Sequence, residues 1–358
     1  MKGRVLVAGF ATRHVAQSAF RAGYSVYAVD HFCDQDLHWY TEDRIRFDEL
    51  EDLPVAIEDL CRRYRFDLIV MTSGAEDIAS DIPVCGTSKE KVIRFLDKLE
   101  MQHFFEELKV PVAGLAKDGV YPAMIKPRRG SGGWRNTVAH SADETEAWKE
   151  RYPGIKFLSQ QLVNGVPSSV CCVADGGTCA RAIATNEQLL RGKGESAFGF
   201  CGSVTPFYHP QSSRMIAIAE TIAAASGCSG TVGIDFVAGQ EPHVIEINPR
   251  FQATVDTIEM AMACNLFQIH VDACRGILPN APLRPVMYAA RRILFAEKDT
   301  HLRANLKHHS PIIADIPWPE TFFEKDQAIT SVYGWGETRE AALTRLDKNI
   351  TTIQQYLR

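Results

Sequence analysis

Two carboxylates and an amide lie in two short apolar runs that are neighbours in the sequence. Asp235 belongs to the run 233–237 (GIDFV), and Glu246 and Asn248 belong to the run 244–250 (VIEINPR). The residues between the runs, 238–242 (AGQEP), are typical of a turn, so the two runs are predicted to form a β-hairpin. Side chains alternate along a strand, which sends Glu246 and Asn248 to one face and, after pairing, brings Asp235 close to Glu246.

These three side chains would share one surface as oxygen donors. Two neighbouring carboxylates repel each other unless a cation lies between them. Carboxylate and amide oxygens suit Mg²⁺, which usually keeps water and takes phosphate oxygens as its remaining ligands. A solvated hairpin face that carries acids by chance is the alternative, and the hairpin alone does not decide between the two.

A second pattern places a lysine before a glycine-rich loop. Lys126 ends an apolar strand, Pro127 stops the pairing, and the segment 128–134 (RRGSGGW) follows. Glycines let successive backbone N–H groups point at one anion, and the lysine adds a fixed positive charge. The spacing differs from G-x-x-x-x-G-K-[ST], so we interpret this as a phosphate-binding loop of another design. A flexible hairpin turn is the alternative.

Size and composition restrict the class of protein. A chain of 358 residues is long enough for two or three packed units. Its 46% apolar and 23% charged residues are typical of a globular protein. Its net charge of −5 does not indicate the basic surface that binds nucleic acid. The most apolar helix, at 215–228, is too short to span a bilayer. Ten cysteines without a C-x-x-C pair, and no signal peptide pattern at the N-terminus, favour reduced thiols in a cytoplasmic protein.

The first third of the chain alternates strands with helices. Strands are expected at 4–9, 25–30, 67–72 and 82–85, with helices near 12–23 and 54–64, which predicts a doubly wound α/β unit. Gly9 is the one glycine where G-x-G-x-x-G needs three, so we exclude a dinucleotide site with Asp30 on the ribose. Thr12 and Arg13 are weak candidates for binding a small anionic substrate, and a polar helix start is the favoured explanation of them.

The remaining elements predict a mixed α/β (α+β) fold. We expect one long helix at 88–108 that begins at Ser88 and contains Lys98, and a mobile loop at 191–203 that could act as a lid. A proline-rich boundary near 279–285 precedes a small α/β cap. The other predicted helices are 142–151, 212–226, 254–274 and 338–356, and the other strands are 156–163, a pair within 168–186, 287–295 and 328–334.

The order of these motifs resembles the ATP-grasp superfamily over about residues 4–274, and the tail is similar to the cap of biotin carboxylase-like members. The resemblance implies ATP held between two β-sheets. It also implies a Rossmann-like domain at 1–87, an ATP-grasp domain at 88–283 with a clamp at about 110–185, and a carboxylase-like cap at 284–358.

The same resemblance assigns residues to each part of the nucleotide. The phosphates would contact Lys98, Lys126, Ser131, Gly132 and Gly133. The adenine would lie on the linker strand Gln160, Gln161, Leu162 and Val163, bonded to the backbone of Gln161 and Val163. Magnesium would be held by Asp235, Glu246 and Asn248. Arg250 and Lys126 would be catalytic, with Arg250 on the reacting phosphate or acyl group.

The chain departs from the family pattern at two positions. Gln160 replaces the acid that usually begins the linker strand, and Pro167 replaces a glutamate for the ribose hydroxyls. Both departures concern the nucleoside and leave the phosphate and metal sites as described.

The implied activity is that of an ATP-dependent carboxylate–amine ligase, related to archaeal-type carboligases and amino-acid ligases. It would activate a small carboxylic acid as an acylphosphate with ATP and Mg²⁺ (or Mn²⁺) and release ADP and phosphate. Arg128 or Arg129 could hold the substrate carboxylate, or both could be exposed loop charges. The alternatives are carboxylation through carboxyphosphate and a nucleotide-binding regulator without turnover. The expected partners are small molecules, and binding to nucleic acid or to a membrane is not expected. The sequence does not decide whether the protein forms a homodimer.

Overall fold

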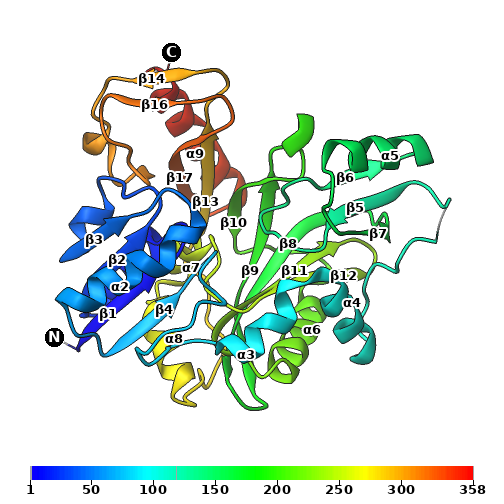
Figure 1. Ribbon diagram of the computed structural model, residues 1–358, viewed down its shortest axis with the longest axis horizontal. Helices are drawn as coiled ribbons and strands as arrows, with labels where there is room; N and C mark the ends of the chain where they lie inside the picture. Colours follow the sequence, from blue (N-terminus) through cyan, green and yellow to red (C-terminus); the bar gives the residue numbers. More distant parts are fainter. Residues whose placement is uncertain (1, 118, 358) are drawn as a thin grey trace.

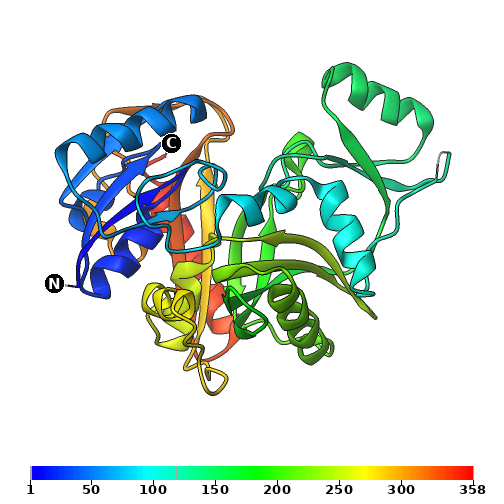
Figure 2. The same ribbon diagram turned by 60° about the horizontal axis from the view of Figure 1, so that its bottom comes forward.

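The computed structural model describes residues 2–117 and 119–357, which form three parts around one large sheet (Figure 1). The N-terminal domain is blue in Figure 1, the clamp is the green part that projects on the opposite side, and the C-terminal part is orange and red. Turning the view shows the clamp standing away from the rest of the molecule (Figure 2). The mixed α/β architecture confirms the predicted fold class.

The N-terminal domain is built on a four-stranded parallel sheet of order β3-β2-β1-β4. The buried runs β1 (Arg4–Ala8), β2 (Ser25–Asp30) and β4 (Leu68–Met71) pair along their length, and β3 (Asp43–Arg46) lies at one edge. Helices α1 (Arg13–Arg21) and α2 (Leu53–Arg63) bury their apolar faces in two separate clusters. The strand expected at 82–85 is reduced to an isolated bridge between Ile69 and Val84.

The helix predicted at 88–108 is not continuous. It is divided into α3 (Lys89–Val92), a 3-10 turn (Ile93–Leu96) and α4 (Lys98–Glu107). Asp97 adopts an extended conformation and its side chain accepts a hydrogen bond from the Leu99 N–H, so it caps a new helix. Lys98 therefore begins a helix, where the sequence placed it inside one.

The clamp has its own three-stranded sheet of order β6-β5-β7. Its strands are β5 (Ala123–Pro127), β6 (Thr137–Ala139) and β7 (Phe157–Gln161), and α5 (Ala142–Arg151) covers them with Trp148. This sheet covers less of the chain than the clamp range of about 110–185, because the next strands hydrogen-bond into the large sheet.

The large sheet has eight strands in the order β12-β11-β8-β9-β10-β13-β17-β15. It comprises β8 (Val166–Asp175), β9 (Ala180–Leu190), β10 (Phe200–Thr205), β11 (Ser229–Ala238), β12 (Pro242–Asn248), β13 (Tyr288–Phe295), β15 (Ile313–Ala314) and β17 (Ala328–Gly336). The tail strands β13 and β17 thus belong to the large sheet, while β14 (Thr300–Leu302) and β16 (Thr321–Phe323) form a separate ribbon.

Helices cover this sheet. Helix α6 (Ser212–Ala225) packs on β8 and β9, and α9 (Arg339–Gln354), capped by Thr338 as expected, packs on β17. The helix predicted at 254–274 is divided into α7 (Val255–Met262) and α8 (Leu266–Cys274). The division follows Ala263 in the left-handed region at φ 48°, and Asn265 caps α8 through a bond from the Gln268 N–H.

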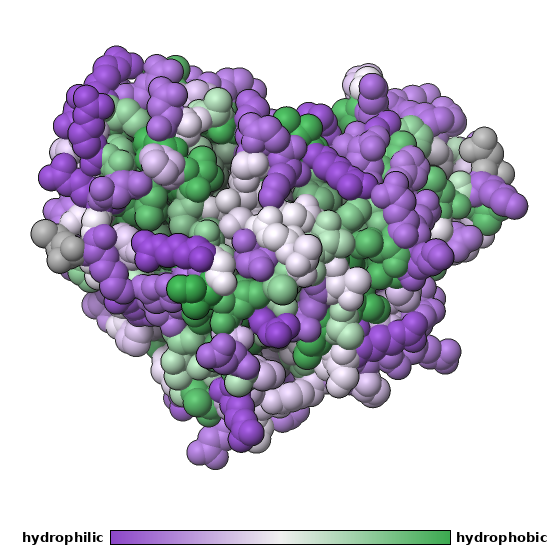
Figure 3. Space-filling model, turned by 90° about the horizontal axis from the view of Figure 1, so that it is seen from below, coloured by the Kyte–Doolittle hydropathy of each residue, from purple (hydrophilic) through white to green (hydrophobic). Residues whose placement is uncertain are grey.

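The surface mixes hydrophilic and hydrophobic residues, and the outline seen in Figure 3 is indented between two lobes. Within the described ranges, no helix combines the length and apolar character needed to cross a membrane. Further single turns of 3-10 helix lie at Leu37–Trp39, Leu50–Asp52, Gly194–Ser196 and Lys307–His309.

Candidate functional site

The hairpin β11–β12 brings the predicted oxygen donors together. Asp235 pairs with Glu246 across the two strands, and Asn248 stands opposite Gly233. The Asn248 Nδ2 atom donates a hydrogen bond to Asp235 Oδ2 at 3.1 Å. The predicted hairpin and the proximity of the two carboxylates are confirmed.

Burial and like charge act together on Asp235. Burial, followed by the charge of Glu246, raises its pKa to about 7, while Arg250 and hydrogen bonds from Gln188 and Asn248 oppose that shift. Gln188 on β9 donates to Asp235 Oδ1 at 2.9 Å. Nothing in the sequence pointed to Gln188. It lies near Asp235 only because β8 pairs with β11 on one side and with β9 on the other. A cation between the carboxylates would favour their charged forms.

Two lysines approach the same carboxylate from different parts of the chain. Lys98 Nζ lies 3.3 Å from Glu246 Oε1 and donates to the Gly130 carbonyl at 2.6 Å. Lys126, near the end of β5, is 7% exposed, and burial lowers its pKa to about 8, with Glu246 opposing and Lys98 adding to the shift. The site therefore holds two ammonium groups beside two carboxylates.

The break before α4 positions Lys98. Arg128 Nε and Nη2 donate to the two oxygens of Asp97 at 2.9 and 2.6 Å, and the Lys98 N–H donates to the Arg128 carbonyl at 2.8 Å. This bidentate pair attaches the start of the helix to the end of β5. Arg128 is thus engaged within the protein, whereas Arg129 is exposed.

The glycine-rich loop lies against the segment predicted to be a lid. Gly132 and Gly133 have φ of 67° and 75°, and a Cβ on Gly133 would stand 2.0 Å from the Phe198 carbonyl oxygen. The Phe200 N–H donates to the Gly132 carbonyl at 3.2 Å, and β10 begins at Phe200. Ser131 is exposed at the loop. The end of the expected mobile loop is therefore an ordered strand.

The linker strand β7 buries Leu158 and Gln160 and exposes Gln161. The Gln160 amide, where the family usually has an acid, donates to Gln102 Oε1 at 2.7 Å and is buried. The Gln161 N–H donates to the Gly114 carbonyl at 2.8 Å, so this backbone donor is already used within the protein. Leu162 and Val163 follow the end of the strand and are half-buried.

Arg250 connects this site to the N-terminal domain. Its Nε donates to Glu76 Oε1 at 2.6 Å, and its Nη2 donates to Asn248 Oδ1 at 3.2 Å. Both side chains of the ion pair are largely buried, at 12% and 15% exposed. Glu76 lies in a loop after β4 and carried no sequence signal.

Thr12 and Arg13 do not form an anion site. The Thr12 N–H and hydroxyl donate to Asp30 Oδ2 at 2.5 and 2.8 Å. Arg13 is buried and donates to both oxygens of Asp256 at 2.9 and 2.7 Å and to Asp315 at 2.8 Å. These contacts satisfy both residues inside the protein, so their interpretation as substrate ligands is wrong. Arg13 instead ties α1 to α7 and to the C-terminal part.

The comparisons with known proteins agree with this geometry. The ATP-grasp domain family matches residues 95–254. An uncharacterized protein of Methanocaldococcus jannaschii is 25% identical over 92% of this chain and 87% of its own length. A D-alanine–D-alanine ligase of Anaeromyxobacter is 25% identical over 46% of this chain and 55% of its own. Carbamoyl phosphate synthase large chain of Caldanaerobacter subterraneus is 24% identical over 66% of this chain, which spans only 24% of that protein.

Solved structures share the fold over nearly the whole chain. Biotin carboxylase of Campylobacter jejuni superposes with a TM-score of 0.80 at 14% identity, covering 99% of this chain and 91% of that one. The biotin carboxylase domain of Hydrogenobacter thermophilus 2-oxoglutarate carboxylase, solved with MgADP and bicarbonate, gives 0.79 at 14% identity over 98% and 89%. The family match identifies residues 95–254 as an ATP-grasp domain, and the chain as a whole shares its fold with these biotin carboxylase structures.

The residues present suit a magnesium-bound triphosphate. Two carboxylates and an amide oxygen offer hard donors, and the adjoining ammonium groups offer charge for phosphates. Gln252 is buried and donates to Asp235 at 3.3 Å, while its Oε1 is among the buried atoms of the described residues that lack a hydrogen-bond partner. An unsatisfied buried oxygen on a side chain that contacts Asp235 fits a site that is completed by a cation or its water.

Proposed function

We propose that this protein is an ATP-dependent, ADP-forming ligase that joins a small carboxylic acid to an amine through an acylphosphate. The observation that carries the proposal is the pairing of Asp235 with Glu246 beside Lys98 and Lys126. A carboxylate is a poor electrophile, and phosphorylation by ATP turns it into an acylphosphate that an amine can attack. In such transfers the protein mainly positions groups and neutralises charge.

Each part of the site has a role in that chemistry. Asp235, Glu246 and Asn248 would hold Mg²⁺, which supplies charge neutralisation for the phosphates. Lys98 and Lys126 flank these ligands and would bind phosphate oxygens, and backbone groups of the loop 131–133 would close over them. Arg250 lies beside Asn248 and would stabilise the negative charge that develops during transfer.

The nucleoside would lie on the linker segment that ends the clamp sheet. The Gln161 N–H is already bonded to Gly114, so we assign the adenine contacts to the Gln161 carbonyl and the Val163 N–H. Gln160 is buried and bonded to Gln102, so it would support the linker segment and would not contact the nucleotide directly.

A carboxylase that acts through carboxyphosphate is the second candidate. The observation that favours it is the likeness to biotin carboxylase structures over 98–99% of this chain, including the strands β13 and β17 of the C-terminal part. In this reaction bicarbonate would take the place of the organic acid in the same site.

Release of ADP distinguishes the candidates. The purified protein with ATP and Mg²⁺ should be screened against pairs of small acids and amines, with mass detection of products. ADP release that requires both an acid and an amine supports the ligase, and release that requires bicarbonate without an organic acid supports the carboxylase. Nucleotide binding without ADP release under any condition would indicate a regulator and would contradict both.

The cellular setting is part of the same proposal. All ten cysteines are free thiols, which agrees with a cytoplasmic protein that acts on small molecules. The Hydrogenobacter domain was solved as a dimer, so the mass of this protein in solution should be measured alongside its activity.

A further inference from the structure

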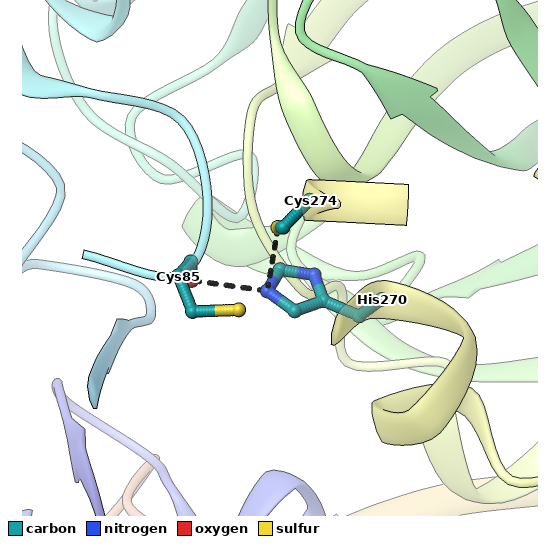
Figure 4. A group of neighbouring side chains, drawn as sticks. All are labelled: Cys85, His270 and Cys274. Carbon is teal, nitrogen blue, oxygen red and sulfur yellow. Dashed lines mark hydrogen bonds between the residues drawn. The ribbon is translucent and has the colours of Figure 1, made fainter. Parts of the chain in front are cut away.

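A second cluster of reactive groups lies where the N-terminal domain meets α8. Cys85, His270 and Cys274 each direct one side-chain atom towards the others, and these atoms lie within 4.8 Å of one another (Figure 4). His270 and Cys274 are one turn apart on α8, and Cys85 lies on the segment that leads from β4 to α3. The proposed ligase chemistry does not use these residues.

The hydrogen bonds of His270 fix the position of its proton. The Thr231 backbone N–H can only donate, and it donates to His270 Nδ1 at 2.8 Å. The Nδ1 lone pair is therefore occupied, and the ring carries its proton on Nε2, which lies 3.0 Å from the Cys85 carbonyl oxygen. A metal would need the Nε2 lone pair, so this tautomer disfavours a Cys₂His metal site.

The same arrangement favours a thiolate on Cys274. Its Sγ lies 3.8 Å from His270 Nε2. The hydrogen bond from the Cys85 thiol lowers the pKa of Cys274 to about 4, with burial opposing the shift and His270 adding to it. The C-terminal end of a helix disfavours an anion, so these donors are what stabilise the thiolate there.

Accessibility differs between the two sulfurs. Cys274 is half-buried at the end of α8, whereas Cys85 is buried. Cys85 and His270 line a cavity of about 10 Å³ together with Glu76 and Arg250, which is room for about one water molecule. An oxidant would therefore meet Cys274 first, and Cys85 is placed to react second.

We propose that Cys274 and Cys85 are a reactive dithiol that a peroxide converts to a reversible disulfide. The Cys274 thiolate attacks one peroxide oxygen, the O–O bond breaks, and hydroxide leaves with a sulfenic acid on Cys274. Cys85 gives its proton to that hydroxide and attacks the Cys274 sulfur, so an S–S bond forms as the S–O bond breaks. The hydroxide that leaves in this second step takes up the proton that Cys274 released when it ionised. In total, two thiols lose two electrons, the peroxide becomes two water molecules, and a dithiol reductant reverses the change.

The product would link two parts of the fold. A disulfide needs the two sulfurs at about 2 Å, so the two sulfur atoms, which now lie within 4.8 Å of each other, must approach when the bond forms. The bond would join the 85–87 segment of the N-terminal domain to α8, next to the cavity that contains Arg250.

Peptide mapping tests the proposal on the intact chain. The protein is treated with a small excess of hydrogen peroxide, blocked with an alkylating reagent and digested with trypsin. The expected product joins the peptides 66–89 and 251–275, and dithiothreitol releases them. Fragment spectra must distinguish Cys274 from Cys264, which lies in the same peptide. Absence of a Cys85–Cys274 link would overturn the proposal, as would one tightly bound zinc ion per chain.

Alkylation rates give a test that needs no variant. At pH 6, wild-type Cys274 should react with iodoacetamide at least about tenfold faster than the exposed Cys179, because only a thiolate reacts. Equal rates at Cys274 and Cys179 would contradict the proposal.

Two variants test the role of Cys85 in the second step. In Cys85→Ser the oxidation should stop at a sulfenic acid on Cys274 that dimedone traps. The control Cys179→Ser should form the disulfide as the wild type does.

Discussion

Arg250 Nε donates a hydrogen bond to Glu76 Oε1 at 2.6 Å, which joins a residue just beyond the β11–β12 hairpin to a loop of the N-terminal domain. The pair is 174 residues apart in the chain. Because Arg250 also contacts Asn248, the N-terminal domain sets the orientation of a side chain at the proposed phosphate site.

Glu76→Gln should therefore lower turnover although Glu76 does not touch the nucleotide. The amide keeps the size of the side chain and loses the charge that orients Arg250, so we expect kcat for ADP release to fall about tenfold with little change in KM for ATP, on the order of 1.4 kcal/mol in activation free energy. Glu107→Gln, at an exposed pair with Arg94, is the control. An unchanged kcat in Glu76→Gln would contradict a positioning role.

Neutral isosteres at the metal ligands should abolish most activity and leave the fold intact. Asp235→Asn and Glu246→Gln each remove a carboxylate, and we expect turnover to fall on the order of 10²–10³. Because burial raises the pKa of Asp235, Asn at this position should unfold at an equal or higher temperature without Mg²⁺. Glu241→Gln at the tip of the same hairpin is the control, and near-normal rates in both site variants would end the metal assignment.

Lys126→Met should separate stability from activity. The lowered pKa of Lys126 means that its charge is costly in the buried site, so an apolar side chain of similar length should raise the free energy of unfolding by roughly 1–3 kcal/mol. Phosphate binding should weaken, seen as a KM for ATP raised about tenfold or more. Urea titration and ADP release measure the two effects, with the exposed Lys149→Met as control. A destabilised variant with unchanged KM would refute the assignment.

Gly133→Ala tests the contact between the glycine-rich loop and the segment at Phe198. A methyl group would meet the Phe198 carbonyl oxygen at 2.0 Å, so the loop must shift. Gly154→Ala is a matched control, because Gly154 has φ 76° against 75° and an added methyl there would have no atom within 4 Å. Both variants should lose about 1 kcal/mol of stability from the backbone conformation, and only Gly133→Ala should also lose ADP release. Equal activity in the two would show that this contact is unimportant.

His14 should make stability fall in mild acid. Burial lowers its pKa from 6.5 to about 4, with Arg13 adding to the shift and Asp256 opposing it. Between those values the unfolded chain binds a proton that the native protein does not, so stability decreases as the pH falls, by roughly 3 kcal/mol in total. Urea unfolding at pH 7 and pH 5 should show a smaller difference in His14→Gln than in the wild type. Equal differences would mean that His14 does not titrate this way.

Local pairing explains what could be predicted without the structure. Asp235 and Glu246 are close in sequence, and a short turn between apolar runs determines their register, so the hairpin and its face follow from alternation. The lysine before the glycine-rich loop is likewise a local pattern. Helix continuity was predicted less well, because Asp97 is extended and bonded to Arg128, the residue after β5.

The sequence by itself determined the donor types, their order along the chain and the class of fold. The tertiary structure alone decided which distant groups complete the site: Lys98 reaches Glu246 across 148 residues, and Gln188 reaches Asp235 across 47. It also excluded Arg13 as a substrate ligand by surrounding it with carboxylates. The physical reason is that such contacts depend on how separate sheets and helices pack, and residue spacing along one element carries no information about that packing.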